Sequence, residues 1–237
     1  LKIVGNFREN DIKNGGQGAP IAVFYHKYIL NNFTSSALIL NLGGIANISC
    51  IKRKKLIAFD VGPANALIDD LMYYFDRKNY DKDGKIAFKG RQDQKIIDKY
   101  KKDIFFKLKY PKSLDREHFK KYLNLLKKIK KEDSICTASM MTVEGIIIGI
   151  KILKKNINTV ILTGGGRNNL FIFQTLKQIF KSKRKNIILI DELNFNGDFL
   201  ESQAFAYLAI RCVRKLPLSL PTTTGVKKPI SGGLIYQ

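Results

Sequence analysis

The sequence has few of the residues that usually build metal or nucleophile sites. It contains three cysteines and two histidines among 237 residues. Cys50, Cys136 and Cys212 lie far apart without C-x-x-C spacing, which indicates small buried thiols in a reducing cytoplasm. His26 and His118 have no partner at ligand spacing, so we expect neither a metal site nor a catalytic triad from them. The sequence also lacks the Walker motif G-x-x-x-x-G-K-[ST] and the G-x-S-x-G nucleophile elbow.

Long apolar runs are absent too. A membrane-spanning helix needs about 20 apolar residues, and the longest candidate, residues 146–150, stops at Lys151. No charged-then-apolar signal segment opens the chain, so we expect no membrane partner. The first residue is Leu1 and residues 1–4 have the pattern of a strand, so we expect a further amino-terminal portion to precede them.

Acidic residues are scarce, with 20 Asp and Glu against 42 Lys and Arg, and the net charge is +22. This charge suggests a nucleic-acid partner. However, the lysines are spread along the chain, and their densest stretches, residues 120–131 and 177–185, are typical of solvated helix faces. No helix-turn-helix, zinc-finger or aromatic RNA-binding signature accompanies them. We therefore expect no nucleic-acid partner, because charge alone governs solubility and non-specific association.

The most informative feature present is a pair of glycine-rich turns, each following an apolar strand. Residues 38–47 read LILNLGGIAN and residues 159–169 read TVILTGGGRNN. Consecutive glycines let a ligand approach bare backbone, whose N–H groups suit anionic oxygens. Either turn alone could be an ordinary tight turn. Two such turns, each followed by Asn and a helix start, favour a nucleotide-binding enzyme.

Strands that alternate with helices predict α/β layers. Residues 76–134 are lysine-rich and short of strand signals, which predicts a helical insertion. Thr137 is a candidate cap for the long helix that follows, because its hydroxyl can accept from a free N–H group. Strands are expected over residues 1–4, 36–41, 47–51, 55–60, 159–163 and 186–190, and helices over residues 21–31, 66–75, 134–154, 169–180 and 199–214.

Three carboxylates are candidates for chemistry, and each has a structural alternative. Asp11 precedes the glycines of residues 15–18 in an expected loop, where it could act as a general base or bond its own turn. Asp60 ends a strand, where it could face a metal–phosphate complex or cap a turn. Glu201 opens the last helix, where it could bind substrate hydroxyls or only favour the helix dipole. Residues 81–84 (DKDG) lack the later ligands of a calcium loop and predict a turn with a positional role.

Seven collinear segments together resemble the anhydro-N-acetylmuramic acid kinase family, which belongs with sugar kinases, actin and Hsp70-type ATPases. The segments are DIKNGGQGAP (residues 11–20), NLGGIANIS (41–49), DVGPANALID (60–69), DKDG (81–84), GGGRNN (164–169), Gly197-Asp198 with Glu201, and AFAYLA (204–209).

The resemblance implies an α/β, actin-like ATPase (ribonuclease H-like) fold, with two lobes around a cleft. Residues 1–30 would be a remnant of the N-terminal lobe with the catalytic loop. Residues 31–237 would be one complete C-terminal lobe with the nucleotide-binding turns and a helical insertion at about 76–134. The family's amino-terminal phosphate turn, Gly-Thr-Ser…Asp-Gly, is absent because the chain starts after it, so an N-terminally truncated member is expected.

The implied activity is a cytoplasmic, ATP-dependent kinase of cell-wall recycling. It would convert 1,6-anhydro-N-acetylmuramic acid and water to N-acetylmuramate 6-phosphate and ADP, with ATP and Mg²⁺. The expected partners are the amino-sugar substrate and a second copy of the chain in a homodimer. The alternative is a non-catalytic nucleotide-binding relative or an inactive fragment.

The resemblance also implies roles for individual residues. Asp11 would be the catalytic base, and Asp60 would face Mg²⁺. The sugar would contact Gly16, Gln17 and Glu201. The nucleotide would contact Gly43, Gly44, Asn47, Gly164, Gly165, Gly166 and Asn169.

Two segments depart from the family pattern. Asn6-Phe7-Arg8 stands where the family usually has Asp-Phe-Arg. Residues 112–117 read KSLDRE where the family usually has KSTGRE, so the resemblance does not assign this second segment a substrate contact.

Overall fold

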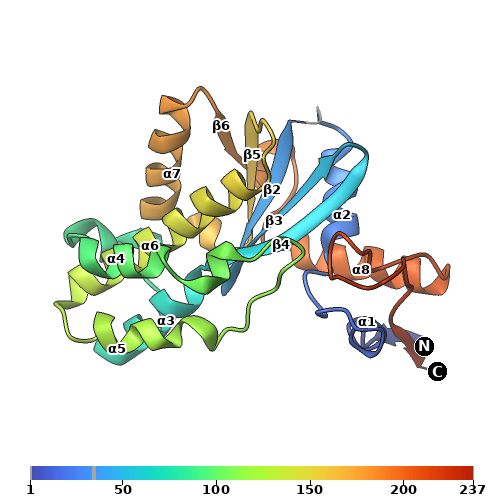
Figure 1. The fold of residues 1–237 in the computed structure, drawn as a ribbon, viewed down its shortest axis with the longest axis horizontal. Coiled ribbons are helices and arrows are strands. Elements are labelled where there is room, and N and C mark those ends of the chain that lie inside the picture. Colours follow the sequence, from blue (N-terminus) through green and yellow to red (C-terminus); the bar gives the residue numbers. More distant parts are fainter. Residues whose placement is uncertain (1, 34–35, 237) are drawn as a thin grey trace.

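A five-stranded sheet with helices on both faces forms the centre of the protein (Figure 1). This computed structural model describes residues 2–33 and 36–236; Leu1, the first residue of the expected opening strand, lies outside them. The strand order is β4-β3-β2-β5-β6, and β3 runs antiparallel to the other four. The sheet strands are β2 (Ala37–Leu42), β3 (Ile45–Lys52), β4 (Lys55–Pro63), β5 (Thr159–Thr163) and β6 (Asn186–Leu189).

The chain order explains this topology. Short turns join β2, β3 and β4 into an antiparallel meander, whereas β5 and β6 are parallel to β2 and are reached through helical connections. In order of appearance the strands are arranged 3-2-1-4-5. The mixed α/β expectation is confirmed.

The helices match the sequence predictions closely, with shifts of a few residues at their ends. Eight α-helices and six short 3₁₀ turns occur in residues 2–33 and 36–236. The helices are α1 (Glu9–Lys13), α2 (Val23–Leu30), α3 (Asn65–Asp76), α4 (Gln94–Lys101), α5 (Leu123–Leu126), α6 (Lys131–Ile152), α7 (Leu170–Ser182) and α8 (Leu200–Val213). The 3₁₀ turns are η1 (Lys82–Gly84), η2 (Ala87–Lys89), η3 (Ile104–Lys107), η4 (His118–Tyr122), η5 (Gly165–Asn168) and η6 (Ile190–Leu193).

Two local predictions were wrong. Asp11 lies in the short helix α1 rather than in a loop. Thr137 does not cap α6, because that helix begins six residues earlier, at Lys131. The Thr137 hydroxyl instead donates to the Asp133 carbonyl at 2.6 Å and accepts from the backbone N–H of Asp93 at 2.9 Å. It therefore ties α6 to the helical segment that precedes it.

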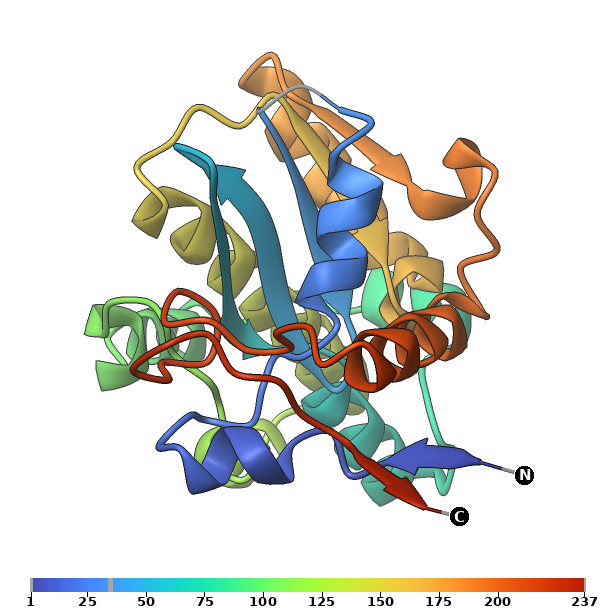
Figure 2. The same cartoon turned by 90° about the vertical axis from the view of Figure 1, so that its right-hand side faces the viewer.

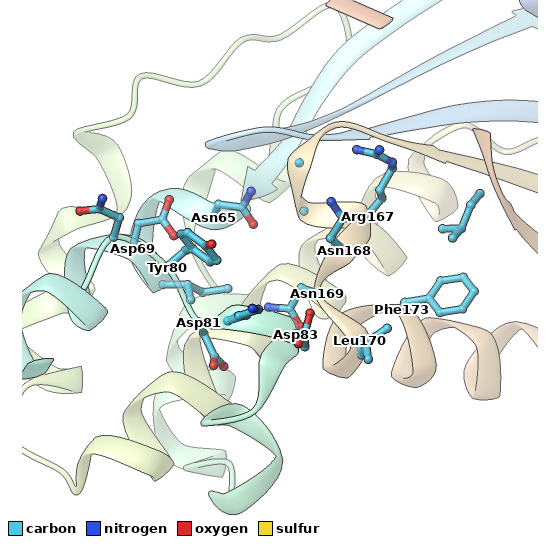
Figure 3. A pocket seen from close by; sticks show the side chains of 16 residues that line it. Asn65, Asp69, Tyr80, Asp81, Asp83, Arg167, Asn168, Asn169, Leu170 and Phe173 are labelled. Atoms are coloured by element: carbon cyan, nitrogen blue, oxygen red, sulfur yellow. The ribbon is translucent and has the colours of Figure 1, made fainter. Parts of the chain in front are cut away.

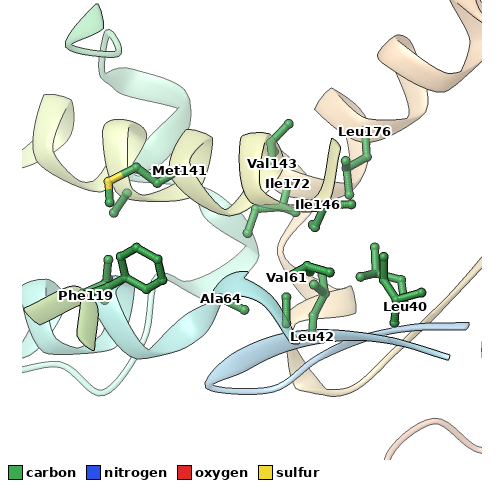
Figure 4. Close-up of a cluster of buried hydrophobic side chains, with 14 of the residues drawn as sticks. Leu40, Leu42, Val61, Ala64, Phe119, Met141, Val143, Ile146, Ile172 and Leu176 are labelled. Carbon is green, nitrogen blue, oxygen red and sulfur yellow. The ribbon is translucent and has the colours of Figure 1, made fainter. Parts of the chain in front are cut away.

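Both faces of the sheet are buried, which explains why its strands are continuously apolar. Along β2, Leu38 and Leu40 face one side, Ala37 and Ile39 face the other, and none is more than 3% exposed. The first side packs against α6 and α7, where Ile146, Ile172 and Leu176 lie over Leu40 (Figure 4). The second side is covered by α2 and α8, as the turned view shows (Figure 2).

Helix α6 crosses the sheet at close range because two of its glycines face β4. A Cβ on Gly145 would lie 2.8 Å from the Val61 carbonyl oxygen, and one on Gly149 would lie 2.3 Å from Val61 Cγ1. By length and composition alone α6 could cross a membrane, but 67% of its apolar window is buried inside the protein. This burial is what a core helix of a globular domain shows.

The described residues between α3 and α6 hold helices and 3₁₀ turns and no strand, as predicted for residues 76–134. Their core is aromatic, with Tyr100 and Phe119 at 5.2 Å between ring centroids. Beside these rings the Asp103 carboxylate accepts from Lys121 at 2.6 Å and contacts His118 at 2.9 Å. Asp103 thereby joins several parts of this helical region.

The two ends of the chain lie side by side (Figure 1). β1 (Ile3–Gly5) pairs antiparallel with β7 (Leu234–Tyr236) in a separate two-stranded sheet. The expected division of the chain at residue 30 stays a prediction. Helix α2, on the amino-terminal side of that division, packs on the main sheet through Tyr25 and Ile29.

Candidate functional site

The two glycine turns lie side by side at one edge of the sheet. β2 and β5 are parallel neighbours, and their register pairs Asn41 with Thr163, the residues near the ends of the two strands. The Thr163 hydroxyl donates to Asn41 Oδ1 at 3.1 Å, which fixes the two strand ends to each other. The turns that follow therefore leave the sheet at the same edge, where open α/β sheets usually bind ligands.

The first turn is fixed through its carbonyl groups and leaves its N–H groups available. The Gly43 carbonyl accepts from the Asn65 N–H at 3.0 Å, and the Gly44 carbonyl accepts from the N–H groups of Ala64 and Ala66. In the part of the chain that the structure describes, the N–H groups of Gly43, Gly44 and Gly165 have no hydrogen-bond acceptor. Free N–H groups on a rigid turn suit an anionic ligand.

The second turn needs glycine at two of its three positions. Gly164 has φ +80°, and a Cβ there would lie 2.6 Å from the Leu42 carbonyl oxygen. A Cβ on Gly166 would lie 2.7 Å from Leu42 Cβ. Gly165 differs, because no atom lies within 4 Å of its Cβ position. Two glycines thus allow close packing between the turns, and the third leaves open space.

Three adjoining cavities follow this edge of the sheet. The glycine cavity, of about 380 Å³, is lined by Gly43, Gly44, Gly164 and Gly165. The outer cavity, of about 790 Å³, lies toward α3 and α7 and shares Gly165 and Arg167 with it. The carboxylate cavity, of about 250 Å³, contains Asp60. It shares a wall with the glycine cavity, made of Ala22, His26, Asn41, Glu201 and Ala204.

The outer cavity has apolar and amide walls. Tyr80 and Asp69 lie on one side, and Asn169 and Phe173 lie on the other (Figure 3). Asn169 is only 7% exposed, and its Oδ1 accepts from the Ile172 N–H at 3.1 Å, which caps α7. Part of this side chain is therefore structural, while its amide nitrogen has no hydrogen-bond acceptor among the described residues.

The DKDG turn supports that wall, and its contacts within the protein are those of a packed turn. The Asp81 carboxylate accepts from the N–H groups of Ile86 and Ala87 at 2.9 and 3.0 Å. Gly84 has φ +70°, and a Cβ there would lie 2.5 Å from Asn169 Oδ1. The turn therefore packs directly against the start of α7.

Arg167 holds the second glycine turn in place, and the sequence analysis assigned it no role. Its guanidinium bonds Asp191 at 2.8 Å, Asp198 at 2.8 Å and the Gly164 carbonyl at 3.2 Å. It is 5% exposed, and Gly197 leaves the room that it occupies. The signal available in the sequence was the position of Arg167 inside the GGGRNN segment. Once buried, its charge requires partners, and Asp191 and Asp198 provide them.

Asp60 is a buried carboxylate in the carboxylate cavity. It is 5% exposed, and its Oδ2 accepts from the Leu114 N–H at 2.7 Å. Burial raises the pKa of Asp60 to about 7, although that hydrogen bond and the charges of Arg8 and Lys112 oppose the rise. Leu114 and Lys112 belong to the segment that departs from the family pattern, so this segment supports Asp60 through its backbone.

Asn47 lies opposite Asp60 on the neighbouring strand β3, next to a bulge at Ala46. It lines the carboxylate cavity and not the glycine cavity, so it is separated from Gly43 and Gly44. No group of three or more His, Cys, Asp or Glu side chains able to hold a metal ion occurs among the described residues. A metal here would therefore need most of its ligands from a bound molecule or from water.

Asp11 lies close to this cavity but is closed off from it. Arg8 and Pro20, from the same segment, line the carboxylate cavity. Asp11 itself is 1% exposed, and its two oxygens accept from the Gly18 N–H and the Thr224 hydroxyl, both at 2.6 Å. Its carboxylate thus holds its own loop, the structural alternative considered for it, and also the distant carboxyl-terminal tail.

Gly16 and Gln17, the two loop residues predicted to contact the sugar, have different environments. Gly16 leaves room for Asp11, since a Cβ there would lie 2.2 Å from Asp11 Oδ2. Gln17 is exposed and donates its N–H to the Thr224 carbonyl at 2.9 Å. Neither residue lines the three cavities, so their predicted sugar contacts stay predictions.

Glu201 and His26 occupy the wall between the glycine and carboxylate cavities. Glu201 lies in the first turn of α8 and is exposed. His26, from α2, is 4% exposed, and its Nδ1 lies 2.9 Å from Ser49 Oγ. No role was expected for His26, because it has no partner at ligand spacing in the sequence. Its partner is on a strand, and the pairing depends on the fold.

Comparison with known proteins gives a family. The sequence model of anhydro-N-acetylmuramic acid kinase matches residues 1–237. Proteins of that name from Zymomonas mobilis and Pelagibacter ubique are 36% and 40% identical to the chain. The matches cover 100% and 99% of this chain. They cover 64% of each relative, so the chain spans about 64% of their length.

Solved structures give weaker likenesses. One is the activator of the 2-hydroxyisocaproyl-CoA dehydratase from Clostridium difficile with bound ADPNP, with TM-score 0.46 and 13% identity, covering 80% of this chain and 65% of that one. Another is a ligand-bound xylulose kinase from Lactobacillus acidophilus, with TM-score 0.45 and 13% identity, covering 78% and 42%. Both scores lie below 0.5, so neither likeness bears on the function.

Proposed function

Because the chain belongs to the anhydro-N-acetylmuramic acid kinase family, we propose that its full-length protein is an ATP-dependent kinase of cell-wall recycling. The reaction converts 1,6-anhydro-N-acetylmuramic acid, water and ATP to N-acetylmuramate 6-phosphate and ADP. The observation that carries the proposal is the row of adjoining cavities at the sheet edge, with the two glycine turns at its centre.

The three cavities suit three parts of the reactants. The outer cavity offers Tyr80 and Phe173 to a nucleoside, with Asn169 at its inner end. The glycine cavity offers backbone N–H groups to the phosphates, with Gly166 bringing the second turn close to the first. The carboxylate cavity, with Glu201 on its wall, is the place for the sugar.

The chemistry needs one base and a path for one phosphoryl group. The oxygen of water forms a bond to the anomeric carbon while the bond from that carbon to O6 breaks. O6 forms a bond to the γ-phosphorus, the bond from that phosphorus to ADP breaks, and Asp11 takes the proton of the water. The remaining demand on the protein is positioning and charge neutralisation.

For Asp11 to act in this way, one of its oxygens has to exchange a protein partner for water. We expect the Thr224 hydroxyl to be the partner that leaves, because a hydroxyl can rotate away, whereas the Gly18 N–H is fixed by the backbone of the loop. We therefore expect the sugar to bind with a shift of the segment around Thr224. Gly16 and Gln17, which lie between Asp11 and Gly18, would then contact the sugar.

Asp60 suits a Mg²⁺ ion that arrives with the nucleotide. Mg²⁺ is commonly held by one or two carboxylates together with substrate phosphates and water. Asp60 Oδ1 has no hydrogen-bond donor in the residues that the structure describes, and Asn47 lies opposite Asp60. When bound, the ion would neutralise charge on the transferred phosphoryl group. It would also favour the ionised form of Asp60, whose pKa burial otherwise raises to about 7.

The proposal includes a cytoplasmic location, a homodimer, and the amino sugar as the partner molecule, with no membrane or nucleic-acid partner. Buried free thiols at Cys50, Cys136 and Cys212 support a reducing compartment. The net charge of +22 is expected to give only salt-sensitive, non-specific association with nucleic acid.

The test compares the full-length protein with its Asp11→Asn variant. We expect the wild type to release one ADP per sugar phosphorylated, and to place ¹⁸O from labelled water at the anomeric carbon. Asp11→Asn should lower kcat by about 10²- to 10⁴-fold, as loss of a general base does, and should leave ATP affinity nearly unchanged. Asp98→Asn, on the exposed side of α4, is the matched control and should leave kcat unchanged.

Two results would contradict the proposal. A wild type that binds ATP but never phosphorylates the sugar would favour a non-catalytic nucleotide-binding relative. An Asp11→Asn variant that forms the 6-phosphate at the normal rate would remove Asp11 from the role of base.

A further inference from the structure

His26 is a buried histidine at the boundary between the glycine and carboxylate cavities. It lines both of them, together with Asn41 and Glu201, and it is 4% exposed. Its Nδ1 contacts Ser49 Oγ at 2.9 Å, and its Nε2 has no hydrogen-bond partner among the described residues. One ring nitrogen is thus fixed by the protein, and the other is available to a ligand.

Ser49 decides which nitrogen carries the proton. The Ser49 hydroxyl is fully buried on β3, and His26 Nδ1 is its hydrogen-bond partner in the part of the chain that the structure describes. If Nδ1 carried the proton, the hydroxyl hydrogen of Ser49 would have no acceptor among the described residues, and leaving a buried hydrogen bond unmade is unfavourable. The satisfied arrangement has Ser49 donating to Nδ1, which leaves the proton on Nε2.

The ring remains neutral at physiological pH. Burial lowers the pKa of His26 to about 4. The charged groups that line the same two cavities are Arg8, Asp60, Arg167, Asp198 and Glu201, and within the described part of the chain none forms an ion pair with His26. Nε2–H is therefore an uncharged donor that does not titrate between pH 5 and 8.

We propose that His26 donates a hydrogen bond from Nε2 to an oxygen of the γ-phosphoryl group as that group passes from the glycine cavity to the carboxylate cavity. This inference rests on the proposed function and adds a catalytic residue to it. Asn41 supplies a second uncharged donor on the same wall, because its Oδ1 accepts from the Thr163 hydroxyl and its amide N–H groups have no acceptor among the described residues. Donors that are already fixed stabilise developing charge without reorganising during the reaction.

Two substitutions separate this role from a purely structural one. The side-chain nitrogen of His26→Gln can take the place of Nε2, whereas the shorter His26→Asn can replace only Nδ1 and its contact with Ser49. We expect His26→Asn to lower kcat by about 100-fold, in the range seen for the loss of one such donor, and His26→Gln to lower it by less than 10-fold. KM for the sugar should change little in either variant. His118→Gln, whose ring contacts Asp103 in the helical segment, is the control and should leave kcat unchanged.

A second measurement does not depend on turnover. ¹⁵N spectra of the histidine rings in the full-length protein report which nitrogen is protonated. We expect His26 to carry its proton on Nε2 at pH 7, and its Nε2–H signal to shift when a non-hydrolysable MgATP analogue is added. Ser49→Ala removes the fixed donor to Nδ1 and should give a mixture of the two neutral forms.

The failures of the two proposals can be told apart. Absence of sugar phosphorylation in the wild type sinks the proposed function. Normal wild-type turnover with equal kcat values for His26→Asn and His26→Gln sinks only the role of His26. An Nε2–H signal that does not respond to the nucleotide analogue does the same, even if both variants are unstable.

Discussion

The glycine cavity and the carboxylate cavity share one wall but are built in opposite ways. The first is lined by five glycines, of which Gly43 and Gly165 offer backbone N–H groups, and side chains enter it mainly from its walls. The second is lined mainly by side chains, above all the buried Asp60, which accepts from the Leu114 N–H and feels the charges of Arg8 and Lys112. The binding properties of the glycine cavity therefore depend on the conformation of its turns. Those of the carboxylate cavity depend on the burial of Asp60 and on the charges near it.

The strongest test of the glycine turns is the substitution Gly164→Ala, which adds a methyl group to the second turn. Ala there would have to adopt φ +80° and would meet the Leu42 carbonyl oxygen at 2.6 Å. We expect Gly164→Ala to lower the free energy of unfolding by about 2–4 kcal/mol, from backbone strain and overpacking together. Denaturant unfolding measures this loss, and nucleotide affinity should fall with it.

Gly165→Ala is the matched control for that experiment. Its Cβ would have no atom within 4 Å, so the free energy of unfolding should change by less than about 0.5 kcal/mol. The methyl group would project into space that lines the glycine and outer cavities, so ATP should bind more weakly to a fully folded protein. Equal losses of stability in the two variants would refute this account of the turn.

The carboxylate side is tested by pH. Burial raises the pKa of folded Asp60 to about 7 from the usual 3.8, so the folded state holds this proton more tightly than the unfolded state. The stabilising effect is complete below about pH 4 and is lost as the pH rises through 7. Between pH 5.5 and 7 the wild type should lose about 2 kcal/mol relative to Asp60→Asn, at about 1.4 kcal/mol per pH unit.

His26 also lines the carboxylate cavity, and its contribution to stability changes with pH in the opposite direction. Its pKa is lowered by burial to about 4 from the usual 6.5, so its contribution is present above pH 6.5 and is lost as the pH falls toward 4. Unfolding of His26→Gln should therefore show less acid sensitivity than that of the wild type.

One result would contradict the prediction for Asp60. If the stability of the wild type and of Asp60→Asn changes in parallel with pH, Asp60 is ionised throughout that range.

The smallest expected effect is that of Asn169→Ala, which tests whether Asn169 only caps α7 or also contacts ATP. Asn169→Ala removes the cap of α7, and Asp93→Ala removes the equivalent cap of α4, far from the cavities. Each should lower the free energy of unfolding by about 1 kcal/mol. Only Asn169→Ala should also weaken ATP binding, as measured by calorimetry. If both variants bind ATP normally, Asn169 is a cap and no more.

Much of the fold could be predicted because its signals are local. The apolar strands of β2 and β5 and the helical spacing of α7 and α8 were clear from the sequence, since apolar period and capping are short-range properties. The position of the two glycine turns next to each other could not be read directly from the sequence. It depends on parallel pairing of β2 with β5 across more than a hundred residues, which no local pattern encodes.

The roles of the candidate site residues stay predictions, but the structure shows that several of their environments differ from those expected. Asp11 was expected in an open loop, but Thr224, from the other end of the chain, closes over it. His26 was set aside because its partner Ser49 lies on a different element. Arg167 lies within a predicted motif, but no role was expected for it. Its partners Asp191 and Asp198 follow β6, more than 20 residues further along the chain. Burial and long-range partners are products of tertiary packing, so sequence spacing does not reveal them.

The central claim is that the two glycine turns hold a triphosphate between them. The most direct measurement is the amide ¹⁵N–¹H spectrum of the protein during titration with a non-hydrolysable MgATP analogue. The account predicts the largest shifts at Gly43, Gly44 and Gly165, with smaller shifts around Asn169 and none around Asp103. Unchanged signals at these three glycines at millimolar nucleotide, or shifts confined to the helices around Asp103, would contradict it.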